Sequence, residues 1–166
     1  MSIVVRRGKF ADVKAITAIF NQGIEGGVAT LETKLQKESD IISWMEDRDP
    51  RYLILVGEND SGEVCGYVSL NKFNFKSAYG GVADLSIYIE KNSRGQKIGE
   101  TLIQKVIEEA KKEGFYKLVI NVISKNEKAL HFYEKIGFSL AGVYKKQGIL
   151  QGEWVDAIIM EKFLIE

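Results

Sequence analysis

Apolar residues recur with helical spacing in four stretches of the chain. In the clearest stretch, which follows residues 94–99 and continues to about Glu113, they fall at i, i+4, i+5, i+8, i+9 and i+12. This spacing places them on one face, so a long amphipathic helix is predicted, with Gly114 as its C-terminal cap. The other predicted helices cover residues 11–21, 38–47 and 126–135.

Shorter apolar runs, several of them alternating with polar residues, predict seven strands. Residues 59–62, Asn-Asp-Ser-Gly, indicate a hairpin turn between two of them, because these residue types tolerate a positive φ. Residues 72–81 are expected to be irregular, and Gly23 with Gly26 and Gly27 to end the first helix. The predicted strands cover residues 3–6, 52–56, 64–70, 84–89, 118–122, 139–146 and 154–163.

The order of these elements is β-α-α-β-β-β-α-β-α-β-β, which predicts an α/β fold with a mixed sheet. The length of 166 residues suits one domain, and no repeat, low-complexity tract or linker divides the chain. With 45% hydrophobic and 28% charged residues, the composition is that of a globular protein. A single domain over residues 1–166 is therefore expected.

The charges of the chain balance, with 23 Lys and Arg against 23 Asp and Glu. Proteins that hold nucleic acid or an anionic membrane by bulk charge carry a basic excess, so neither partner is expected. A local basic site remains compatible with this balance. One Cys (Cys65) and one His (His131) cannot form a zinc site, so no metal is predicted. No secretory signal and no bilayer-spanning run is present, which indicates a cytoplasmic protein.

Residues 87–99 carry the most informative local pattern. An apolar strand runs into a basic turn containing Gly95, and this turn opens directly into the long helix. Free N–H groups at a helix N-terminus bind anions, and Arg94 and Lys97 add positive charge there. The spacing matches neither the dinucleotide fingerprint nor the P-loop. Taken alone, the pattern fits a phosphate site and an ordinary capped helix start about equally well.

A second motif follows one strand later. Residues 126–138 read N-E-K-A-L-H-F-Y-E-K-I-G-F. Together, the two segments resemble the GCN5-related N-acetyltransferase (GNAT) superfamily, whose pyrophosphate loop [QR]-x-x-G-x-[GA] precedes an N-x-x-A-x-x-F-Y-x-x-x-G-F segment. The resemblance extends to the phosphinothricin acetyltransferase-like branch in residues 19–21, 29–33, 83–89 and 152–156. It implies a GNAT fold, with a mostly antiparallel twisted sheet flanked by about four helices.

The resemblance also implies acetyl-CoA as co-substrate. Its pantetheine arm is expected along residues 87–89, its pyrophosphate on residues 94–99, and its sulfur near Asn126 and Tyr133. The implied cofactor-binding residues are Ile87, Tyr88, Ile89, Arg94, Gly95, Gln96, Lys97, Ile98, Gly99, Asn126 and Tyr133.

Two residues are expected to be catalytic. Asp84 stands where this branch usually carries a Glu suited to act as general base, and the shorter side chain would reach the amine through a water or by a shifted substrate. The alternative for Asp84 is a solvated aspartate at a strand end. Tyr133 is the candidate general acid for the leaving thiolate, and its alternative is a core position on an apolar helix face. Cys65 has no paired His, so direct attack in a ternary complex is expected.

Lys97 departs from the family pattern, because it stands at the first required Gly of the loop. A residue with a Cβ avoids positive φ unless strain is accepted, so a slightly reshaped loop is expected. We hypothesise that the Lys97 side chain compensates by pairing with a phosphate.

The acceptor is expected to be a small amino-acid-like amine of the phosphinothricin or methionine sulfoximine type. The implied substrate-binding residues are Glu32, Phe73, Phe75, Tyr79 and Asp84, with Lys72 and Lys76 placed to receive a carboxylate. Enzymes of this branch often form homodimers, which is also expected here. Two other functions remain open: acetylation of a protein N-terminus or lysine, and a non-catalytic acetyl-CoA-binding regulator.

Overall fold

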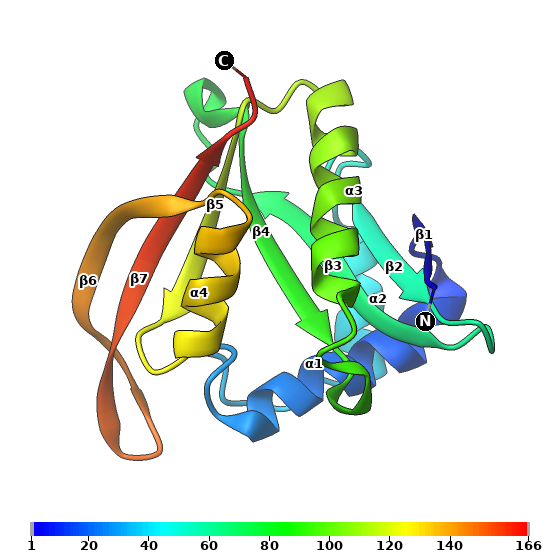
Figure 1. Cartoon of the computed structure of the whole chain (residues 1–166), viewed down its shortest axis with the longest axis horizontal. Helices are drawn as coiled ribbons and strands as arrows, with labels where there is room; N and C mark the ends of the chain where they lie inside the picture. Colours follow the sequence, from blue (N-terminus) through cyan, green and yellow to red (C-terminus); the bar gives the residue numbers. More distant parts are fainter. Residues whose placement is uncertain (1, 166) are drawn as a thin grey trace.

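A seven-stranded sheet in the order β1-β2-β3-β4-β5-β7-β6 runs through the molecule (Figure 1). The computed structural model describes residues 2–165. The strands are β1 (Val4–Arg7), β2 (Ile54–Glu58), β3 (Val64–Lys72), β4 (Val82–Ile89), β5 (Lys117–Ile123), β6 (Ser139–Leu150) and β7 (Glu153–Phe163). The helices are α1 (Val13–Gly26), α2 (Glu38–Glu46), α3 (Ile98–Lys112) and α4 (Glu127–Lys135). Short 3-10 helices cover Phe10–Asp12, Ser77–Tyr79 and Lys91–Ser93.

The predicted α/β fold with a mixed, mostly antiparallel sheet and about four helices is confirmed. In the part of the chain that the structure describes, the parallel pair is β4 with β5, and the other neighbouring strands are antiparallel. None of the helices within residues 2–165 is long and apolar enough to cross a bilayer.

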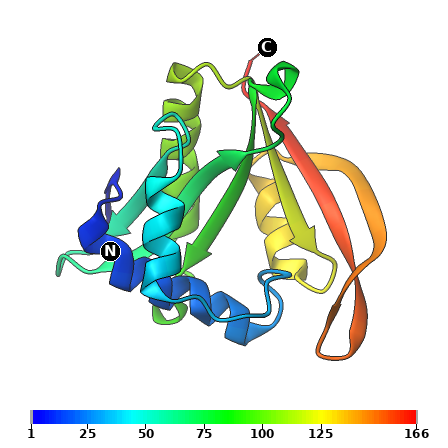
Figure 2. The ribbon, with the colours of Figure 1, turned by 180° about the vertical axis from the view of Figure 1, so that it is seen from behind.

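Helices cover both faces of the sheet. α1 and α2 lie on one face (Figure 2), and α3 and α4 lie on the other (Figure 1). In β2, Ile54 and Val56 pack with α1 and α2, whereas Leu55 packs in the cluster that contains α3. Successive strand side chains point to opposite faces, so a strand covered on both sides reads as an unbroken apolar run.

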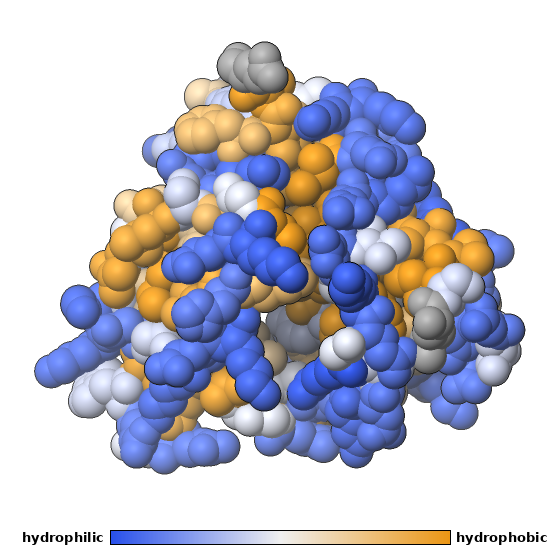
Figure 3. Space-filling view, in the orientation of Figure 1, coloured by the Kyte–Doolittle hydropathy of each residue, from blue (hydrophilic) through white to orange (hydrophobic). Residues whose placement is uncertain are grey.

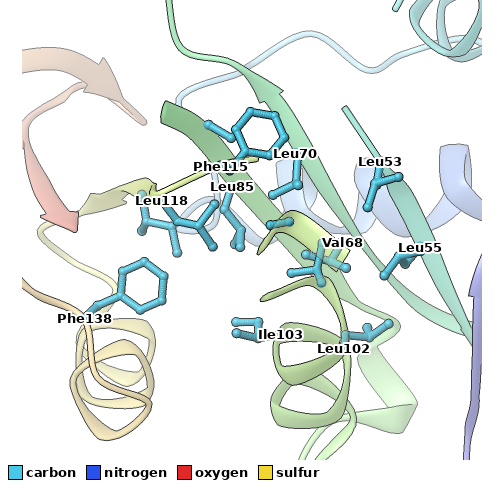
Figure 4. Close-up of a cluster of buried hydrophobic side chains, with 14 of the residues drawn as sticks. Leu53, Leu55, Val68, Leu70, Leu85, Leu102, Ile103, Phe115, Leu118 and Phe138 are labelled. Atoms are coloured by element: carbon cyan, nitrogen blue, oxygen red, sulfur yellow. The ribbon is translucent and has the colours of Figure 1, made fainter. Parts of the chain in front are cut away.

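The larger hydrophobic core lies between α3 and the sheet (Figure 4). Leu102, Ile103 and Val106 of α3 are fully buried there, together with Phe115 and Leu118. Burying a side chain of this kind contributes about 1.5–3 kcal/mol. The apolar stripe of α3 thus holds the N-terminus of this helix firmly beside the end of β4.

The parallel strands β4 and β5 pair over a short length and then separate. Their register joins Val82 to Lys117 and continues to Asp84, which pairs with Val119. Beyond this point β4 continues to Ile89 and β5 to Ile123 without further pairing to each other. The separation leaves one edge of β4 open in the middle of the sheet.

The first helix is longer than predicted, because α1 continues through Gly23 and ends at Gly26. Gly27, with a φ of 75°, forms the left-handed C-cap. Gly23 is buried inside the helix, where a Cβ would lie 3.1 Å from the ring of Tyr88. The prediction that Gly23 ends the helix is wrong, since this glycine serves a close tertiary contact.

β6 also extends beyond its predicted end at residue 146 and reaches Leu150. The register against β7 shifts between Tyr144 and Gly148, and Lys146 adopts a φ of 49°. The Lys146 N–H donates to the Asp156 carboxylate at 2.8 Å. A β-bulge therefore interrupts the strand without ending it.

Candidate active site

A large cleft opens where β4 and β5 separate. Its volume is about 870 Å³, and α1, the loop before α3 and the start of α4 form its other walls. The molecular surface is hollowed between α3 and α4 (Figure 3). Apart from Gln96, all the residues predicted to bind the cofactor line this cleft: Ile87, Tyr88, Ile89, Arg94, Gly95, Lys97, Ile98, Gly99, Asn126 and Tyr133. The fold thus brings two separate sequence motifs to one place.

The open edge of β4 presents backbone hydrogen-bonding groups to the cleft. The Glu90 N–H donates to the Cys65 carbonyl of β3 at 2.8 Å, and Gly66 is opposite Ile89. In an antiparallel ladder, residues alternate between bonding to the partner strand and pointing away from it. The N–H and C=O groups of Ile87 and Ile89 therefore point away from β3, toward the gap. Such groups bind an extended ligand as a neighbouring strand would.

The loop before α3 has a backbone conformation that a residue with a Cβ rarely adopts. Gly95 has a φ of 79° and Lys97 a φ of 61°, so Lys97 adopts the left-handed conformation of the glycine it replaces. This conformation costs about 1 kcal/mol for a residue with a Cβ. Lys97 therefore accepts the backbone strain that a glycine at this position would avoid. The first N–H groups of α3 have no intrahelical partner, and the side chain of the N-cap residue, Lys97, does not cap them.

A smaller cavity of about 310 Å³ lies on the face of β3 and β4 that α1 and α2 cover. Aromatic side chains and Ile41 form its walls, short polar side chains its floor, and acidic or amide side chains its rim. The wall contains Phe20, Trp44, Tyr67 and Tyr88; the floor Ser69, Asn71 and Ser86; the rim Glu32, Gln36 and Asp40.

The polar floor is internally hydrogen-bonded. The Asn71 amide lies 3.1 Å from the Ser69 hydroxyl and 3.4 Å from the Ser86 hydroxyl. Arg48 donates to the Asn71 side-chain oxygen at 3.0 Å. These interactions hold the floor in one geometry.

Asp84 lies on the same face of β4 as Ser86 and Tyr88, because side chains alternate along a strand. It does not line either cavity. Burial raises the pKa of its carboxyl group to about 6, and a hydrogen bond with Asn121 opposes the increase. A carboxylate with this pKa is ionised at neutral pH and still basic enough to accept a proton.

Tyr133 and Asn126 stand at the α4 side of the cleft. Burial raises the pKa of the Tyr133 phenol, so the hydroxyl remains protonated at neutral pH. The Tyr133 ring packs edge-on against Phe138, with ring centroids 5.8 Å apart. The Asn126 side chain caps α4 by accepting a hydrogen bond from the Ala129 N–H at 3.2 Å. This cap is a physical reason for the Asn of the motif.

The aromatic residues predicted to bind the acceptor lie outside the two cavities described above. Phe73, Phe75 and Tyr79 line neither cavity, and neither do Lys72 and Lys76. Phe73 packs against Tyr79 with ring centroids 5.5 Å apart, and Phe75 is 91% exposed. Of the predicted substrate residues, Glu32 borders the smaller cavity.

The polar floor was not predicted, although the sequence carries a signal for it. Ser69 and Asn71 alternate with apolar residues in β3, and Asp84 and Ser86 do so in β4. Polar residues at every second position of two strands that are otherwise buried indicate a polar patch on one face of the sheet.

A model of the acetyltransferase (GNAT) family matches residues 17–138. The chain is 28% identical to an L-methionine sulfoximine/L-methionine sulfone acetyltransferase of Pseudomonas aeruginosa, over 97% of this chain and 94% of the relative. A GNAT superfamily phosphinothricin acetyltransferase from Sinorhizobium meliloti, solved in complex with acetyl-CoA, matches with a TM-score of 0.93 and 26% identity, over 98% of this chain and 89% of that chain. A ribosomal-protein-alanine N-acetyltransferase from Brucella melitensis matches with a TM-score of 0.91 and 30% identity, over 96% and 99%.

Proposed function

Because the chain belongs to the acetyltransferase (GNAT) family, we propose that it moves the acetyl group of acetyl-CoA to the primary amine of a small amino-acid-like substrate. The substrate class follows relatives named for methionine sulfoximine and phosphinothricin. The observation that carries the proposal is the separation of β4 from β5, which opens a cleft between the two family motifs.

The residues of the cleft suit acetyl-CoA. The loop before α3 offers N–H groups, Arg94 and Lys97 to a pyrophosphate. The free edge of β4 offers the backbone groups of Ile87 and Ile89 to the amides of a pantetheine arm. When bound, acetyl-CoA supplies the acetyl group as a reactive thioester.

Asp84 would remove the proton from the acceptor ammonium. An aliphatic amine has a pKa of about 8 to 10, so most of it is protonated at neutral pH. Asp84 borders neither cavity, so we assign this transfer to an intervening water. The free amine then attacks the thioester directly, since Cys65 is buried in β3 and donates to the Gly57 carbonyl.

Tyr133 would donate the proton that the departing thiolate needs. It lines the cleft, and its raised pKa keeps the proton on the phenol until that step. The acceptor would occupy the smaller cavity, beside Glu32, with its amine toward β4. The participation of Phe73, Phe75 and Tyr79 in binding remains a prediction.

A turnover assay that detects the free thiol of CoA tests the proposal. The panel contains phosphinothricin, methionine sulfoximine, methionine sulfone, common amino acids and short peptides. We expect turnover with one or more of the amino-acid-like amines. Acetyl-CoA binding without turnover on any amine would favour a regulator.

Acetylation of a protein N-terminus is the second candidate. It is supported by the structural match to a ribosomal-protein-alanine N-acetyltransferase. In the same panel, turnover on peptides beginning with alanine and none on free amino acids would establish this candidate and exclude the first.

We also propose that the enzyme is a cytoplasmic homodimer. The β6–β7 hairpin exposes large apolar side chains, among them Tyr144, Ile149 and Trp154. Exposed apolar side chains gathered on one element are typical of a protein–protein interface. Light scattering coupled to size-exclusion chromatography tests this, and a mass near 18.7 kDa would contradict it.

A further inference from the structure

Tyr88 is shared by the two cavities. Among the residues that the structure describes, it is the one whose atoms line both the cleft and the smaller cavity. Its ring packs edge-on against Phe20, with centroids 5.1 Å apart, and tilted against Tyr67 at 5.6 Å. The side chain therefore forms the wall where the donor and acceptor would meet.

Gly23 determines how closely this ring approaches α1. A glycine inside a helix costs about 1 kcal/mol relative to alanine. A Cβ at Gly23 would lie 3.1 Å from two ring carbons of Tyr88, which is tighter than ordinary van der Waals contact. Because Gly23 lacks a side chain, the ring lies directly against the helix backbone.

The Tyr88 hydroxyl connects β4 to the loop after α1. Burial raises the pKa of its phenol, and the neighbouring Thr30 side chain opposes this increase. The Thr30 side-chain oxygen accepts the Glu32 N–H at 3.0 Å, and the Glu32 carboxylate accepts the N–H groups of Thr33 and Lys34 at 3.0 and 3.1 Å. Tyr88 on β4 therefore neighbours a hydrogen-bonded turn in the loop that borders the smaller cavity.

We propose that Tyr88 is a positioning residue: packed on Gly23 and interacting through its hydroxyl with Thr30, it holds the loop after α1 in place beside β4. The inference rests on the proposed function, because it assigns the smaller cavity to the acceptor. It adds a role for the side chain of Tyr88, in addition to the position of its backbone in β4, the strand expected to bind the pantetheine arm.

The test uses three variants of the full chain. Tyr88→Phe removes the hydroxyl and keeps the ring, Thr30→Val removes the partner hydroxyl, and Gly23→Ala displaces the ring. Since a hydrogen bond contributes about 1 kcal/mol, each hydroxyl variant should lower kcat/KM for the acceptor about fivefold. Gly23→Ala should lower it about tenfold, since small misplacements are costly in acyl transfer. The dissociation constant of acetyl-CoA, measured by calorimetry, should remain within twofold of wild type.

The double variant of Thr30→Val with Tyr88→Phe distinguishes a shared role from two separate ones. If the hydroxyls act as a pair, the double variant should be no worse than either single variant. Gly142→Ala is the matched control, because an added methyl group in β6 would meet nothing within 4 Å. It should keep wild-type activity, and thermal unfolding confirms that every variant is folded.

Additive losses in the double variant would overturn the proposal. An acetyl-CoA affinity that falls as much as kcat/KM would also overturn it, because the substitutions would then act on the donor. Absence of turnover in the wild-type protein would instead contradict the proposed function, and with it this role of Tyr88.

Discussion

Replacing Asp84 by Asn is expected to raise the stability of the protein and to lower its activity. The substitution keeps the shape of the side chain and removes its charge. In the wild type, burial raises the pKa of Asp84 from 3.8 to about 6. The folded state therefore disfavours the charged carboxylate, and Asn relieves this penalty.

The magnitude follows from the shift. One pKa unit corresponds to 1.36 kcal/mol, so a shift of about two units gives about 3 kcal/mol. Asp84 is only partly buried, and solvent screening reduces this figure to about 2 kcal/mol. For a domain of this size, that raises Tm by about 4–8 °C. Loss of a general base should lower kcat by about 10²–10⁴-fold.

The stability difference depends on pH. Between about pH 4 and pH 6 the folded protein holds a proton on Asp84 that the unfolded chain has released, so wild-type stability falls as the pH rises. The advantage of Asp84→Asn should be complete above pH 6 and absent below pH 4. Wild-type kcat/KM should rise with pH through an apparent pKa near 6.

Denaturant unfolding and the thiol-release assay, both run from pH 4 to pH 9, measure these effects. Asp47→Asn is the control, because Asp47 is exposed at the end of α2 and should change neither quantity appreciably. Full activity in Asp84→Asn would refute the assignment of the base. A variant no more stable than wild type at pH 8 would refute the desolvation argument.

Three further outcomes are expected. Tyr133→Phe should lower kcat at least tenfold with little change in acetyl-CoA affinity; full turnover would exclude Tyr133 as the general acid. Lys97→Gly should raise the free energy of unfolding by about 0.5 kcal/mol by relieving the left-handed strain, and should weaken acetyl-CoA binding with a smaller salt dependence; unchanged binding at low and high salt would exclude a phosphate contact. Asn126→Ala should cost about 1 kcal/mol through loss of the α4 cap, and Asn126→Asp should restore most of it; equal stability of the two variants in urea would contradict the cap.

Local pattern predicted the elements of the sheet and its helices because their apolar residues follow regular periods. The stripe from Ile98 to Ala110 is such a case, and it became the face of α3 in the core. Two motifs, each continuous in the sequence and each located at a helix start, predicted the cleft residues near α3 and α4 but none of those that α1 contributes. The roles assigned to them remain predictions.

The sequence by itself determined which segments form strands and helices, and where the basic loop before α3 and its companion motif lie. These properties depend on neighbours along the chain. Only the tertiary structure decided why Gly23 is a glycine, where β4 leaves β5, and that Tyr88 is common to both cavities. Each of these depends on contacts between residues distant in sequence, and the periodicity of neighbouring residues carries no information about such contacts.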